Sequence, residues 1–175
     1  MQKIWFDVEF NEYTTKLRNG TIIPVLEPIS IGLVDEENRT YTAVFKEFNK
    51  KAAKENRFLR DVVLPKLPPE KTWKTRHEIR EDILNFIGSD DTQFRYWYAP
   101  QDAVILQNIF APKFLQMPRN IEGFPYNLAQ RFNDLGAYHG LIPVKHNEHD
   151  ALADAIWAKE FDKAMDLYEH DVAPD

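Results

Sequence analysis

Lys3-Ile4-Trp5-Phe6-Asp7-Val8-Glu9-Phe10 is the stretch of sequence that decides the fold. Apolar residues occupy every second position from Ile4 to Phe10, and this period of two predicts a β-strand. The same period places Asp7 and Glu9 on one face, ~6.6 Å apart along the strand. Two carboxylates side by side on a buried strand repel each other, so the pair is costly unless a cation lies between them. A surface strand with an acidic outer face would show the same pattern.

Further strands and helices follow this first strand. Residues 29–34 and 41–45 are rich in β-forming residues, and the polar stretch between them indicates a hairpin, so we expect three antiparallel strands at the start. Residues 94–99 are expected to form a fourth strand. Apolar spacing predicts helices over residues 50–64, 76–87, 103–110, 128–135 and 150–168, and Thr75 with Glu78 forms a capping-box pattern before the second. We predict an α/β fold with a mixed sheet flanked by helices, in a single domain over residues 1–175.

The composition excludes several classes of protein. The 175 residues include no cysteine, which excludes a disulfide scaffold, a thiolate zinc site, an iron–sulfur site and a cysteine nucleophile. Hydrophobic residues make up 43% and charged residues 29%, so the chain is not disordered. No run approaches the ~18 apolar residues of a membrane span, and an acid interrupts the first apolar stretch, which argues against a signal peptide. We therefore expect a cytoplasmic protein with no membrane partner.

Charge is distributed unevenly along the chain. The net charge is −6, but residues 46–80 hold 11 Lys and Arg against 5 Asp and Glu, a local charge of +6. A basic segment on an acidic chain suits an acidic active site that attracts a polyanion. Lys50, Lys51 and Lys54 of this segment are therefore candidates for contacts with a substrate strand. A solvated helix face explains the same charges equally well.

A second acidic motif opens the last predicted helix. Asp150 is a natural N-cap residue, so His149 is expected just before the helix and Asp154 in about its first turn. The two side chains can then converge on one point. Small residues at alternate positions let this helix approach a sheet closely: Ala151, Ala153 and Ala155. A capping histidine and a first-turn acid that favours the helix dipole are the simpler interpretations of His149 and Asp154 taken alone.

Asp102 is the third candidate, at the end of the fourth predicted strand. Strand ends in open α/β sheets are common places for binding and catalytic sites. The alternative is that Asp102 only caps the helix predicted over residues 103–110.

Taken together, Asp7-x-Glu9, then Asp102, then His149-x4-Asp154 resemble the DEDDh branch of 3′-to-5′ exonucleases, which have an RNase H-like fold. Residues 27–34 resemble the second-strand signature of that family, and residues 147–155 resemble its third exonuclease motif. The first three strands look most like a small stand-alone exoribonuclease branch that includes polyadenylate-preferring enzymes. One departure is visible, because Asn11-Glu12 replaces the usual Thr-Gly after the first motif.

The resemblance implies a metal-dependent exoribonuclease that degrades single-stranded RNA from the 3′ end to nucleoside 5′-monophosphates. Two divalent cations ~3.5–4 Å apart would activate water and stabilise the leaving oxygen. Their ligands would be Asp7, Glu9, Asp102 and Asp154, whose oxygens suit Mg²⁺ or Mn²⁺ better than zinc. His149 would be the general base.

Alternatives remain open at this stage. The same fold could serve an exodeoxyribonuclease, or a catalytically silent nucleic-acid binding module. A glycosidase using Asp7 and Glu9 as its acid pair would leave Asp102 and the His149–Asp154 pair unused. Phe10 and Tyr13 are candidates for stacking on the terminal base, worth ~1–3 kcal/mol per base, while Trp97 and Tyr98 are expected in the core. The resemblance also allows a homodimer.

Overall fold

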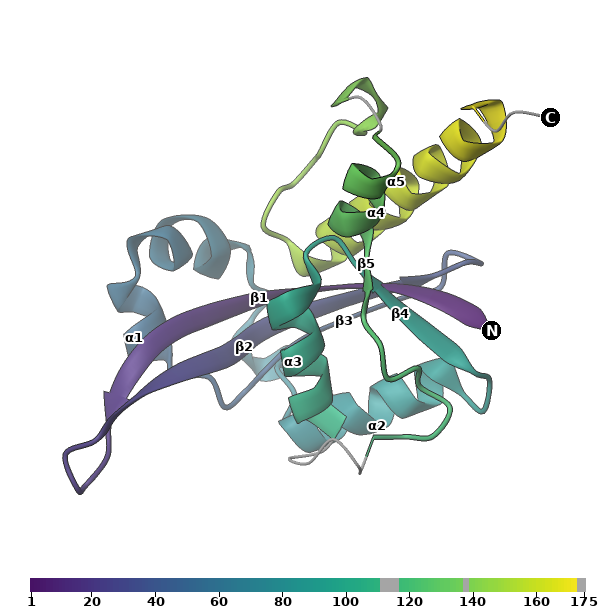
Figure 1. The fold of residues 1–175 in the computed structure, drawn as a ribbon. Coiled ribbons are helices and arrows are strands. Elements are labelled where there is room, and N and C mark those ends of the chain that lie inside the picture. The colour runs from purple at the N-terminus through teal and green to yellow at the C-terminus, as the bar shows by residue number, and fades with distance from the viewer. Residues whose placement is uncertain (111–116, 137–138, 173–175) are drawn as a thin grey trace.

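The computed structural model describes residues 1–110, 117–136 and 139–172, and its centre is a twisted mixed sheet (Figure 1). In this described part the sheet has five strands in the order β3-β2-β1-β4-β5. Their bounds are β1 Gln2–Lys16, β2 Ile22–Asp35, β3 Thr40–Val44, β4 Thr92–Tyr96 and β5 Tyr126–Asn127. β2 pairs antiparallel with both β1 and β3, whereas β4 pairs in parallel with β1 and β5 in parallel with β4. The predicted α/β class and the three antiparallel strands at the start are confirmed.

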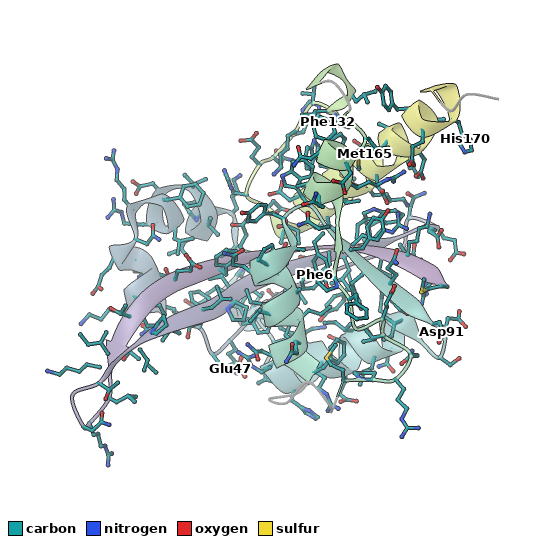
Figure 2. All side chains as sticks on the ribbon, in the orientation of Figure 1. Phe6, Glu47, Asp91, Phe132, Met165 and His170 are labelled. Atoms are coloured by element: carbon teal, nitrogen blue, oxygen red, sulfur yellow. The ribbon has the colours of Figure 1, made fainter. Side chains whose placement is uncertain are left out.

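Helices cover both faces of the sheet. They are α1 Lys50–Glu55, α2 Arg76–Ile87, α3 Ala99–Phe110, α4 Leu128–Asp134 and α5 Ala151–Val172. Ile4, Phe6 and Val8 of β1 pack with α2 and α3 on one face, while Trp5 packs with α4 and α5 on the other. Figure 2 labels a member of each core, Phe6 and Met165. The alternation of β1 therefore sends its odd-numbered side chains, Asp7 and Glu9 among them, toward the face that α5 covers.

One edge of β1 is open where the site forms. β4 pairs with β1 only over residues 2–5, and no described strand continues along that edge. β1 itself runs six residues beyond the predicted end and forms a long two-stranded arm with β2 (Figure 1). The register of the two strands shifts between Glu9 and Phe10.

The prediction of one continuous helix over residues 50–64 is wrong, because the α-helix covers only its first six residues. α1 ends at Glu55, Asn56 has an extended ψ of 114°, and a π-helical turn (Leu59–Val63) and a 3₁₀ turn (Leu64–Lys66) follow. The side-chain oxygen of Asn56 accepts hydrogen bonds from the backbone N–H groups of Phe58 and Leu59. Such local bonds compete with the helical ladder and end α1 early.

The helix expected at residue 103 begins four residues earlier. α3 starts at Ala99, so Asp102 lies in its first turn and not between the strand and the helix. Pro100 fits there because the first N–H groups of a helix have no intrahelical partner. By contrast, the predicted capping box of α2 is present, with Thr75 and Glu78 bonding reciprocally. Across the described ranges, no helix combines the length and apolar character needed to cross a membrane.

Candidate active site

A pocket of about 420 Å³ lies at the open edge of β1. The structure brings all five proposed catalytic residues to its wall: Asp7, Glu9, Asp102, His149 and Asp154. They come from three elements and one loop, since β1 supplies two acids, α3 and α5 supply one each, and the segment before α5 supplies the histidine. Residues separated by more than 140 positions therefore share one cavity.

Gly32 makes this convergence possible. It pairs with Asp7 across β1 and β2, and the first turn of α5 rests directly on its backbone. A Cβ added at Gly32 would lie 2.3 Å from the backbone of Ala151 and Leu152, closer than any real contact. The close approach brings Asp154, one turn into α5, beside the carboxylates of β1.

The segment before α5 is held by the helix cap and by Asp154. The predicted N-cap is present, because Asp150 Oδ1 accepts a hydrogen bond from the Ala153 N–H at 3.0 Å. The His149 N–H donates to Asp154 Oδ2 at 3.1 Å, and the His149 backbone has a left-handed φ of 64°. The rings of His149 and Phe58 are nearly perpendicular, with 4.7 Å between ring centroids. These contacts set the direction of the histidine.

Three of the five residues lie close enough together to hold one metal ion. One ligand atom each from Glu9, His149 and Asp154 lies within 4.8 Å of the other two. Asp102 approaches from α3 and is buried, with 6% of its surface exposed.

Burial and mutual repulsion disfavour ionisation of these acids. Burial, then the charge of Asp154, raises the pKa of Glu9 to about 7. Burial and the charge of Glu9 raise the pKa of Asp102 to about 8. The pKa of Asp7 lies well above its ordinary value, because its carboxyl group is buried and faces the other three acids. A bound divalent cation would offset this repulsion, so the chemistry of the donor set fits a metal.

The raised pKa values predict how stability depends on pH in chelator. The folded-state pKa values of Glu9 and Asp102 exceed their ordinary values of 4.5 and 3.8, so ionising these groups disfavours the folded state. Their unfavourable contribution is absent below about pH 4 and grows as the pH rises to about 8. We expect Asp102→Asn to raise the melting temperature in chelator at about pH 8 and to change it little at about pH 4. Equal shifts at both pH values would contradict the assignment.

The candidate substrate-contact residues, unlike the five catalytic candidates, do not share one pocket. Phe10 lines the pocket beside the acids, but Tyr13 lines a separate hollow on the β1–β2 arm. Lys50 and Lys54 line another hollow, where Lys50 pairs with Glu70 at 2.5 Å, and Lys51 is exposed on α1. The structure therefore places Phe10 with the acids and not the other four.

The two aromatic residues that follow β4 have different surroundings. Trp97 packs on Trp157 and Phe161, as expected of a core residue, although it also reaches the pocket. The expectation for Tyr98 is wrong, because 62% of its surface is exposed and it lines the pocket. Tyr98 follows the last residue of β4 by two positions, where the sheet no longer covers it.

Several residues of the site carry no sequence signal of the kind used above. Asn56, Phe58 and Leu59 reach the pocket only because α1 breaks. Lys145 Nζ lies 3.1 Å from Asp154 Oδ1, and Lys66 donates a hydrogen bond to the Glu148 carbonyl.

The fold and the site define an α/β enzyme with a carboxylate-rich pocket, and comparisons with known proteins identify its family. No protein-family model matches the chain. The 3′-5′ exoribonucleases Rv2179c and MT2234.1, from two strains of Mycobacterium tuberculosis, are each 36% identical to it over 158 residues. The match covers 87% of this chain and 86% of each relative. The chain belongs to this family of 3′-5′ exoribonucleases, and it is an enzyme of the 3′-5′ exonuclease class.

Proposed function

We propose that the chain is a 3′-to-5′ exoribonuclease of the DEDDh branch, with an RNase H-like single domain over residues 1–175. It shortens single-stranded RNA from the 3′ end and releases nucleoside 5′-monophosphates. The observation that carries the proposal is the meeting of five residues in one pocket, in the chain order of the DEDDh motifs: Asp7, Glu9, Asp102, His149 and Asp154. The names of the two relatives support RNA as the substrate.

The four acids would hold two divalent cations, Mg²⁺ or Mn²⁺. Every donor atom they offer is a carboxylate oxygen, and three of the four acids have raised pKa values that a cation would lower again. Asp154 Oδ1 is buried and, within the described structure, makes no hydrogen bond of good geometry, although Lys145 lies near it. When bound, the cations would lower the pKa of an attacking water and stabilise the charge on the departing 3′ oxygen.

His149 would act as the general base in this reaction. Its ring shares the pocket with Glu9 and Asp154, and the bond from its N–H to Asp154 together with the Phe58 contact limits its orientations. It would accept the proton of the attacking water. The histidine is half-buried, so its proton can pass to solvent after each cycle.

The open edge of β1 is where the RNA strand would enter. Phe10 borders the acids, and we assign it to stacking on the terminal base. Tyr13, Lys50, Lys51 and Lys54 would contact the strand farther from the acids, since none of them lines this pocket. A cytoplasmic location and a homodimer stay predictions.

Cleavage products will test the direction of attack. A single-stranded RNA labelled at its 5′ end should shorten one nucleotide at a time, because hydrolysis begins at a free 3′ hydroxyl. The ladder should require Mg²⁺ or Mn²⁺ and disappear in chelator, and gel electrophoresis of timed samples shows both. A matched DNA strand should be degraded more slowly. Release of the labelled nucleotide first, or cleavage of a circular RNA, would refute the proposal, and faster loss of DNA would favour the exodeoxyribonuclease.

A further inference from the structure

Lys145 places a positive charge in direct contact with the acidic cluster. Its Nζ lies 3.1 Å from Asp154 Oδ1 and 5.1 Å from the centre of the Trp157 ring. The lysine side chain is 26% exposed and that of Asp154 is 6% exposed, so solvent screens the pair only in part. The same ammonium group lowers the pKa of both Asp7 and Glu9, against the effect of burial. Lys145 therefore offsets part of the repulsion among the acids.

A single carboxylate holds both ends of the segment that carries the histidine. Asp154 Oδ1 faces Lys145, and Asp154 Oδ2 accepts the hydrogen bond from the His149 N–H. Two non-glycine residues of this segment have a backbone in the left-handed region: φ is 54° at Asn147 and 64° at His149. Such backbone persists only where surrounding contacts hold it. The Lys145 contact is one of those that do.

We propose that Lys145 is the internal counter-cation of the metal-free enzyme, and that a divalent cation displaces it from Asp154. The inference rests on the metal site of the proposed function. A cation coordinated by Asp154 would approach its oxygen to about 2.1 Å. An ammonium group retained on the same oxygen would then lie a few ångströms from a doubly charged ion, and like charges that close repel strongly. Metal binding thus has to break this ion pair, which weakens the apparent affinity for the metal.

A purely structural role for Lys145 predicts the opposite change in metal affinity. If Lys145 served only to orient the Asp154 carboxylate, its removal would leave a metal ligand less well placed, and metal binding would weaken. The sign of the change in affinity therefore separates the two roles. This sign does not depend on measuring hydrolysis.

Calorimetric titration with Mn²⁺ of chelator-treated, dialysed protein tests the inference. Lys145→Met keeps an unbranched apolar stem against Trp157 and removes the charge. We expect it to bind Mn²⁺ about tenfold more tightly than the natural protein, the order expected for removing one competing charge-assisted contact. Lys145→Arg, which keeps the charge, should bind no more tightly than the natural protein. Lys163→Gln is the matched control, because it removes a lysine charge from an exposed position on α5, outside the pocket, and should leave Mn²⁺ affinity unchanged.

Thermal unfolding gives a second readout. Without metal, Lys145→Met should melt at a lower temperature than the natural protein, because the acids lose their counter-cation. Saturating Mn²⁺ should raise its melting temperature by more than it raises that of the natural protein. If Lys145→Met does not fold, Lys145→Gln takes its place in both measurements.

The outcomes separate this inference from the proposed function. Affinity for Mn²⁺ that is unchanged or weaker without the lysine overturns the counter-cation role, while the metal site stands if Asp154→Asn abolishes the binding. Absence of Mn²⁺ binding by the natural protein would overturn both.

Discussion

Asp7→Asn is expected to abolish RNA hydrolysis while the protein stays folded. The substitution keeps the shape of the side chain and removes a charge that the other acids already disfavour. Losing a ligand of the proposed cations should lower the rate constant roughly a thousandfold or more, several kcal/mol of transition-state stabilisation. The melting temperature in chelator should rise, because one source of repulsion is gone. Initial rates on a single-stranded RNA and circular dichroism melts measure the two effects.

Asp91→Asn is the matched control for this variant. Asp91 is exposed beside the start of β4, as Figure 2 shows, and it does not line the pocket. The same chemical change there should alter neither the rate nor the melting temperature appreciably. Near-normal hydrolysis by a folded Asp7→Asn protein would remove Asp7 from the site, and with it the basis for assigning the cations to these acids.

The sequence was most informative where one local rule decides the outcome. The alternation in β1 predicted that Asp7 and Glu9 share one face of the strand, and the fold agrees, because Phe6 and Val8 pack in the core on the other face. The capping preference of Asp150 predicted the start of α5, and the bond from Ala153 is present. These two elements carry three of the five site residues, and His149 directly precedes α5, so the pattern could predict most of the site. The catalytic roles of these residues were inferred from the resemblance to the exonucleases.

The sequence was least informative where two local structures compete at similar energy. Residues 50–64 have helical spacing, but Asn56 bonds to the backbone ahead of it and ends α1. Pro100 is compatible with a loop and with the first turn of a helix, so the start of α3 could not be predicted. β5 has two residues, too few for a periodic signal. Lys145 lies in a loop, and only the tertiary fold shows that it meets Asp154.

Gly32→Ala is expected to produce the second large effect, through the backbone. The new methyl group would occupy space 2.3 Å from the backbone of Ala151 and Leu152, so the start of α5 has to move away from the sheet. Moving α5 by about 1 Å would displace Asp154 and His149 from the β1 acids and lower the rate about a hundredfold. Overpacking of this kind also destabilises a protein by about 1–3 kcal/mol. Urea unfolding and RNA hydrolysis measure the two losses.

Gly88→Ala separates displacement of α5 from loss of stability. Gly88 ends α2 with a φ of 64°, and an added Cβ there would meet nothing within 4 Å. Its φ of 64° and ψ of −142° lie in a region almost confined to glycine, so an alanine there should cost about 1–3 kcal/mol. This variant is thus destabilised about as much as Gly32→Ala, but its pocket is intact, and it should hydrolyse RNA at the normal rate below its unfolding transition. Equal losses of activity in the two variants would show that the close contact between Gly32 and α5 does not position the catalytic residues.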